Sequence, residues 1–102
     1  MFYHAVLMHI AEGADAGLDD QAEALAERIR AECKGLISFH YGSNIADRGK
    51  AFNRAVTGVF ESSAAHDAYQ VSAPHVALSE LLKPHIEDIA VADLDTDGNS
   101  GA

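Results

Sequence analysis

The fold is decided by the first strand-like stretch of the sequence, Phe2-Tyr3-His4-Ala5-Val6-Leu7-Met8-His9-Ile10. Successive side chains of a β-strand point to opposite faces, so these residues separate into two sets. One face carries Phe2, His4, Val6, Met8 and Ile10, and the residues between them form the other face. Both faces are largely apolar, which predicts a strand that is covered on both sides.

A helix is predicted to follow this strand, opening at Asp15. Apolar residues then recur at steps of three or four positions, which makes one apolar stripe on an amphipathic helix. The stripe consists of Leu18, Ala22, Leu25, Ile29 and Cys33. Gly35 lies just beyond it and is a natural helix stop, because glycine readily adopts the left-handed backbone conformation that ends many helices.

Alternating patterns predict three further strands. Two of them cover residues 36–45 and 51–60, and the polar segment 46–50 is a turn between them. The last strand is predicted within the apolar run at residues 89–94.

A helical region divided into two parts lies between the third and last strands. Ser62 and Ser63 offer N-cap oxygens to a short helix that carries Tyr69. Pro74 breaks this helix and fits the first turn of another one, because its missing N–H has no partner to lose there. Pro84 ends the second part.

The order βαββαβ predicts an α+β fold of the ferredoxin-like type, a four-stranded antiparallel sheet with helices on one face. The other sheet face would leave Val6, Met8 and their neighbours in water, a patch too large for a monomer. Two sheets packed face to face would cover it, so we expect a homodimer that forms an α/β barrel. The predicted domain covers residues 1–94, and the acidic tail at 95–102 is expected to be disordered.

The charge balance excludes some partners. The chain has 7 basic and 16 acidic residues, for a formal net charge of −9. Nucleic acids and anionic membranes are therefore not expected to bind. Cys33 is the only cysteine and no apolar run is long enough to span a membrane, which favours a cytoplasmic protein.

Three segments carry a family resemblance, namely His4-Ala5-Val6-Leu7-Met8, then Phe60-Glu61-Ser62 with Asp67-Ala68-Tyr69, and Pro74-His75-Val76-Ala77. Through them the chain resembles the stress-responsive A/B barrel family, whose members are dimeric α/β barrels. The third segment is similar to that family's His-Pro-Ala-His-Val signature, and the resemblance extends over roughly residues 2–94. Ser72 stands where the first signature histidine would be, and the Pro-Ala order is reversed to Ala73-Pro74.

The resemblance implies roles for several side chains. A plant polyketide cyclase of the family uses the histidine and tyrosine that match His75 and Tyr69. The first-strand histidine, which matches His4, lies in the same pocket. Arg54 replaces a histidine of that cyclase's third strand.

The chemistry follows from these residue types. His75 is expected at the start of a helix, where the positive end of the helix dipole favours neutral imidazole and so a general base. Tyr69 can donate a hydrogen bond to a carbonyl or enolate oxygen. We therefore predict a pocket that binds a small, partly hydrophobic carbonyl compound, with a cyclase or lyase reaction that requires no cofactor.

Three alternatives remain open at this point. The protein could bind a ligand without turnover, or it could be a cofactor-free monooxygenase. A purely structural protein that assembles into larger rings is the third alternative. The substrate-binding candidates are His4, Val6, Met8, His40 and Arg54.

No metal site is predicted from the sequence. The six histidines show no His-x₃-His spacing, and no Cys-x₂-Cys pair is possible. His66 and His85 are expected to face solvent. The segment from Asp93 to Gly98 resembles half of an EF-hand loop, but the chain ends before the required twelfth-position glutamate.

Overall fold

The computed structural model describes residues 1–14 and 16–97, and it confirms the order βαββαβ. The elements are β1 (Phe2–Ile10), α1 (Leu18–Glu32), β2 (Leu36–Ser43), β3 (Arg54–Phe60), α2 (Ser63–Gln70), α3 (Ala73–Leu82), the short 3₁₀ helix η1 (Lys83–His85) and β4 (Ile86–Asp95). In the described part of the chain, no helix has the length and apolar character needed to cross a membrane.

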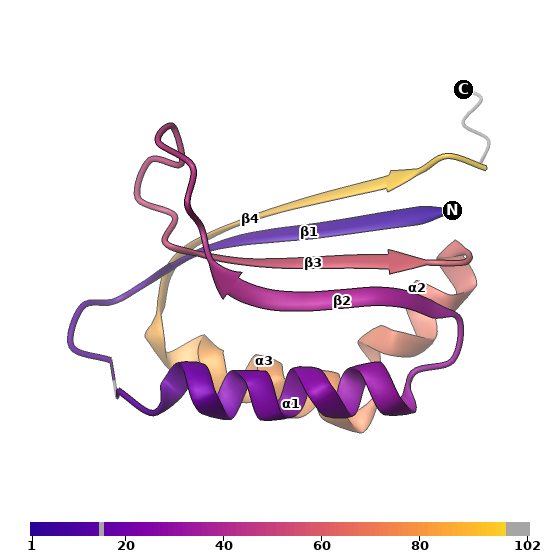
Figure 1. The fold of residues 1–102 in the computed structure, drawn as a ribbon, viewed down its shortest axis with the longest axis horizontal. Coiled ribbons are helices and arrows are strands. Elements are labelled where there is room, and N and C mark those ends of the chain that lie inside the picture. Colours follow the sequence, from indigo (N-terminus) through magenta and orange to yellow (C-terminus); the bar gives the residue numbers. More distant parts are fainter. Residues whose placement is uncertain (15, 98–102) are drawn as a thin grey trace.

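The four strands form one antiparallel sheet in the order β2-β3-β1-β4. All of the helices lie on the same face of this sheet, as Figure 1 shows. The α+β, ferredoxin-like architecture is therefore confirmed. Because β4 is an edge strand, one side of the space between the sheet and α3 is left open.

The core forms where the apolar stripe of α1 meets the sheet. Fully or almost fully buried residues of α1 are Leu18, Ala22, Ala26 and Ile29. From the sheet, Phe39 and Phe60 are the largest side chains that are completely buried. Cys33 is only partly buried, because the helix has already ended at Glu32.

The uncovered sheet face differs from the one expected. Met8 is 2% exposed and points toward the helices, and Val6 shares its face. The odd-numbered residues Tyr3, Ala5 and Leu7 point the other way, since strand side chains alternate. The expectation that Val6 and Met8 face water was therefore wrong, because α1 and α3 pack on their side of the sheet and not on the other.

Several strand boundaries also shift, and β2 ends at Ser43 instead of residue 45. The third strand begins at Arg54, and Asn53 before it uses its side chain to contact the end of β1. The Asn53 side chain accepts a hydrogen bond from the backbone N–H of Ile10 and donates one to its carbonyl oxygen, each at 2.9 Å. The last strand begins earlier than predicted, directly after η1.

Strand β4 extends one residue into the segment 95–102 that was expected to be a tail. Asp95 is the last residue of β4, and the backbone N–H of Thr96 donates to the carbonyl oxygen of Met1 at 2.9 Å. Asp97 forms an ion pair with the N-terminal ammonium group. Residues 98–102 lie outside the described residues.

Gly35 is required by both backbone conformation and space. Its φ of +77° lies in the left-handed region, and a Cβ placed there would lie 2.7 Å from Cβ of Ala65. We expect Gly35→Ala to lower the free energy of unfolding by about 2–3 kcal/mol, measured by chemical denaturation.

Gly13 provides the matched control for this prediction. It also has a positive φ, +85°, but an added Cβ would have nothing within 4 Å. Gly13→Ala should therefore report the backbone effect alone, about 1 kcal/mol. Equal losses in the two variants would show that the contact with Ala65 contributes nothing.

Candidate functional site

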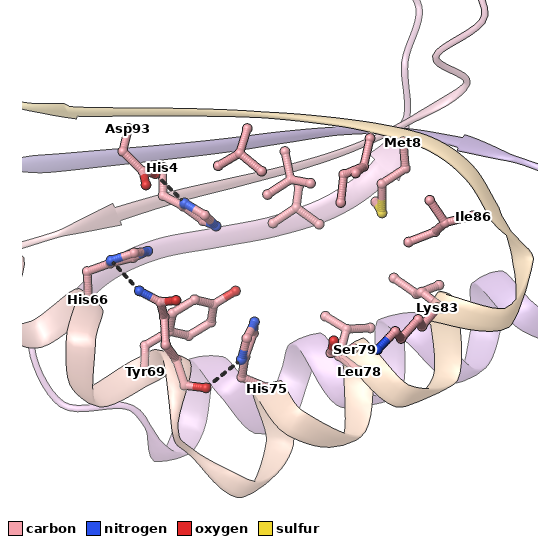
Figure 2. A pocket seen from close by; sticks show the side chains of 16 residues that line it. His4, Met8, His66, Tyr69, His75, Leu78, Ser79, Lys83, Ile86 and Asp93 are labelled. Atoms are coloured by element: carbon pink, nitrogen blue, oxygen red, sulfur yellow. Dashed lines mark hydrogen bonds and ion pairs between the residues drawn. The ribbon is translucent and has the colours of Figure 1, made fainter.

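A cavity of about 660 Å³ lies between the β1–β4 half of the sheet and helices α2 and α3. Its apolar walls come from both layers and include Val6, Met8, Val56, Leu78, Leu82 and Ile86. Most of the polar groups gather toward the opposite end, where Figure 2 shows His4, His66, Tyr69, His75 and Asp93, whereas Ser79 and Lys83 lie beside Leu78 and Ile86. The arrangement suits a small ligand that is apolar at one end and polar at the other.

His75 is placed by the break between the two helices. Pro74 sits in the first turn of α3, as predicted, and His75 follows it. Its Nδ1 lies 2.8 Å from the backbone oxygen of Gln70. A carbonyl oxygen only accepts hydrogen bonds, so Nδ1 carries the proton and donates. Nε2 is then left with a lone pair, and it points into the cavity (Figure 2).

His75 is held in the neutral form. Burial lowers the pKa of its imidazole below the usual 6.5, and the neighbouring His4 acts in the same direction, while the hydrogen bond to Gln70 opposes them. A neutral imidazole with its free nitrogen in a cavity can accept a proton from a bound molecule.

Tyr69 lies on α2, which begins at the predicted N-cap, where the Oγ of Ser62 accepts from the backbone N–H of Ala65. Its ring is 97% buried, with its centroid 4.4 Å from that of the His75 ring. Burial raises the pKa of its phenol, so the group remains a hydrogen-bond donor at neutral pH. Its hydroxyl group points into the cavity beside His75 (Figure 2).

His4 and Asp93 form a pair across two neighbouring strands. They are register partners on β1 and β4, and both side chains point to the cavity face. Nδ1 of His4 lies 2.5 Å from Oδ1 of Asp93. The carboxylate accepts a hydrogen bond from this nitrogen, which fixes the orientation of the ring.

His66 was expected to face solvent, and this expectation was wrong. Its side chain is 4% exposed, stacked on the ring of Phe2 with 4.4 Å between centroids. Burial lowers the pKa of this imidazole, and the neighbouring His4 lowers it further. The missed signal was helical spacing, because His66 precedes Tyr69 by three positions and so shares its helix face.

The structure brings five of the predicted residues to this cavity and leaves two elsewhere. His4, Val6, Met8, Tyr69 and His75 all line it. His40 is exposed on β2, where it lies opposite Thr57 of β3. Strand β2 is the edge strand at the other side of the sheet from β4. Arg54 instead forms a two-point ion pair with Asp19 of α1, at 2.9 Å for each contact. This pair lowers the pKa of Asp19.

The lowered pKa values of His66 and His75 predict a pH-dependent stability. Both groups bind a proton less readily in the folded state than in the unfolded chain, where the pKa is 6.5. Below this pH the unfolded chain carries more protons, so the free energy of unfolding should fall as the pH drops below 6.5 toward the lower folded values.

Urea denaturation across the pH range measures this effect. A double variant, His66→Asn with His75→Asn, should show a flatter profile just below neutral pH. An unchanged profile would mean that neither histidine is held neutral by the fold.

A comparison with protein families identifies the domain. The sequence model of the stress-responsive A/B barrel domain matches residues 2–96. The chain belongs to this family. The family resemblance expected from the first strand and from the segment around His75 is thereby confirmed.

Solved structures support the same fold for this A/B barrel domain. A dimeric ferredoxin-like protein of unknown function from Jannaschia sp. CCS1 has a TM-score of 0.78 at 25% identity, covering 93% of this chain and 98% of that one. Hydroxynitrile lyase from Passiflora edulis has a TM-score of 0.77 at 20% identity, covering 91% and 90%. An antibiotic biosynthesis monooxygenase has a TM-score of 0.77 at 16% identity, covering 94% and 98%. No protein with curated information matches the sequence.

Proposed function

We propose that this A/B barrel domain binds a small, partly hydrophobic carbonyl compound and removes a proton from the carbon next to its carbonyl group. The observation that carries this proposal is that the free Nε2 of His75 and the hydroxyl group of Tyr69 point into the same cavity. One is a neutral base and the other a donor that stays protonated.

The reaction divides between these two residues. The proton on the α-carbon moves to Nε2 of His75, and the electron pair of the broken C–H bond forms an enolate. The enolate oxygen accepts a hydrogen bond from Tyr69, whose buried position strengthens this contact. The α-carbon of the enolate can then attack a second carbonyl group of the same molecule, whose C=O π bond opens while its oxygen takes the proton from Nε2 of His75, or the α-carbon can take the proton back. The first outcome is that of an aldol-type cyclase.

The apolar walls determine the kind of ligand. The side chains of Met8, Leu78 and Ile86 line the end of the cavity away from the histidines, and Ser79 and Lys83 lie beside them (Figure 2). An aromatic or alkyl group is expected to fill this end, while the carbonyl group lies at the polar end. His4, oriented by Asp93, is placed to help hold the polar end of the ligand.

Deuterium exchange tests the proposal without knowledge of the natural substrate. The probe is an α-methyl β-keto ester bearing a phenyl group, and NMR follows the loss of its α-proton in heavy water, corrected for the uncatalysed rate. We expect His75→Ala to lower the catalysed rate by about 10²–10⁴-fold and Tyr69→Phe by about 10²-fold. His40→Ala, outside the cavity, should leave the rate unchanged.

The wild-type exchange rate should rise with pH and then level off. It should level off at a lower pH than it would if the base were an ordinary histidine. The active form of the base is neutral, and burial lowers the pKa of His75 below 6.5. Binding of the probe with no exchange above background would instead support a ligand-binding protein without turnover.

The uncovered face of the sheet supports a homodimer. Small and apolar side chains dominate this face, among them Ala5, Leu7, Ala55, Val59, Ala90, Ala92 and Leu94. Leu94 is 63% exposed in the single chain, and Tyr3 is 44% exposed. A flat apolar face of this kind packs well against a second sheet about 10 Å away. The Jannaschia protein of the same fold is dimeric, which agrees with this proposal.

A further inference from the structure

We infer that His4, His66 and Asp93 form a binding site for a divalent transition-metal ion at the polar end of the cavity. One nitrogen from each imidazole and one oxygen from the carboxylate lie within 4.8 Å of one another. Figure 2 shows the three side chains together at this end of the cavity. The proposal does not rest on the roles proposed for His75 and Tyr69, because an ion can bind here in the absence of any organic ligand, although it gives His4 and Asp93 a second role.

Each ligand is held by a different element. His4 lies on β1, Asp93 lies opposite it on β4, and His66 lies beneath them on α2. The rings of the two histidines are neighbours, with 4.6 Å between their centroids. Since the sheet and the helix fix all three positions, little ordering remains to be done when an ion binds.

His66 provides the independent sign of a missing ligand. Its Nε2 has no hydrogen-bond partner among the described residues, although the side chain is 96% buried. Leaving a buried polar nitrogen without a partner costs about 1–3 kcal/mol. A bound ion would satisfy this nitrogen, and no protein group of the described chain does so.

The groups around the ligands suit metal coordination. Nδ1 of His66 lies 3.2 Å from the amide nitrogen of Gln70. When Nε2 binds an ion, the ring proton must be on Nδ1, and rotation of the Gln70 amide group places its oxygen there as the acceptor. Metal bonds of about 2.0–2.2 Å require donor separations of roughly 3–4 Å, so small side-chain rotations can close the site. The ion then replaces the hydrogen bond between His4 and Asp93.

The donor set selects the kind of ion. Two imidazole nitrogens and one carboxylate oxygen suit Zn²⁺, Fe²⁺ or Co²⁺, whereas Mg²⁺ and Ca²⁺ prefer sites made of oxygen atoms. Three protein ligands leave at least one coordination position open. This position faces the cavity, so a ligand oxygen or a water molecule can occupy it. Asp93 is partly exposed at the open edge, where an ion can reach the site.

Cobalt spectroscopy and zinc calorimetry test the site on the full chain after treatment with a chelator. We expect Co²⁺ to produce visible d–d absorption bands and Zn²⁺ to bind with one ion per chain. His66→Phe and Asp93→Asn should each weaken binding of Zn²⁺ by more than about 100-fold, because even loss of an outer-shell partner costs about 10–100-fold.

Two variants keep the test decisive. His40→Ala removes an exposed histidine outside the site and should leave the affinity unchanged. Asp93 is exposed, so Asp93→Asn should fold normally even if His66→Phe disturbs the packing around Phe2. Absence of the cobalt bands, or zinc binding that survives in Asp93→Asn, would overturn the proposal. Neither result would affect the deuterium-exchange test of His75.

Discussion

Replacing Phe60 with alanine is expected to lower the free energy of unfolding by about 3–5 kcal/mol. The side chain is completely buried, at 0% exposure, in the layer between the sheet and the helices. Its ring contacts those of Phe2, His66 and Tyr69, with centroids 6.4, 5.2 and 5.0 Å away. Its removal leaves a cavity under the polar end of the site.

The same substitution should disturb ligand binding as well as stability. Tyr69 and His66 rest on the Phe60 ring, so both lose the support that fixes their orientation. Urea denaturation at a fixed protein concentration measures the stability. Val71→Ala is the control, because Val71 is 80% exposed and should change the stability by less than about 0.5 kcal/mol. A similar small loss for Phe60→Ala would contradict the described core.

Ala5→Arg is expected to convert the proposed homodimer into a monomer. Ala5 lies on β1 in the uncovered face, between Thr57 of β3 and Ala92 of β4. An arginine at this position would be buried between the two sheets without a carboxylate partner, and two copies would approach each other in the dimer. A penalty of several kcal/mol raises the dissociation constant by more than about 100-fold.

Size-exclusion chromatography with light scattering measures this change. In the isolated subunit Ala5 faces water, so the variant should still fold as judged by circular dichroism. Val71→Arg is the control, because Val71 is 80% exposed just after α2, in the helical layer on the other side of the sheet from Ala5. A wild-type protein that elutes as a monomer would contradict the proposed dimer. An Ala5→Arg variant that remains dimeric would show that the dimer interface does not include this face of the sheet.

Short-range patterns explain why the fold could be predicted. The alternation over residues 2–10 is a strand signal, and the apolar stripe from Leu18 to Ile29 is a helix signal. Both segments keep the predicted secondary structure in the folded protein. The choice of sheet face could not be read in the same way. Both faces of β1 are apolar, and only the position of the helices decides that Met8 is buried while Leu7 faces outward.

The residues of the candidate site also differ in whether a local sequence pattern reveals them. His75 and Tyr69 could be found because Pro74 marks a helix start and the segment resembles a family signature. His66 was missed although its spacing from Tyr69 places both side chains on one face of α2, because the segment alone does not show that this face packs on Phe2. Arg54 was misplaced because its partner, Asp19, comes from α1, and such long-range ion pairs leave no pattern in the sequence.

Long-range proton–nitrogen NMR of the histidine side chains, with and without a phenyl β-diketone, tests whether His75 is a neutral base whose free nitrogen faces a bound carbonyl compound. His75 is predicted to be neutral near pH 7, with its proton on Nδ1. Addition of the diketone should shift its Nε2 resonance in a saturable manner and leave those of His40 unchanged. A proton found on Nε2 of His75 in the free protein, or no saturable shift at that nitrogen, would show that His75 is not the base that removes the proton.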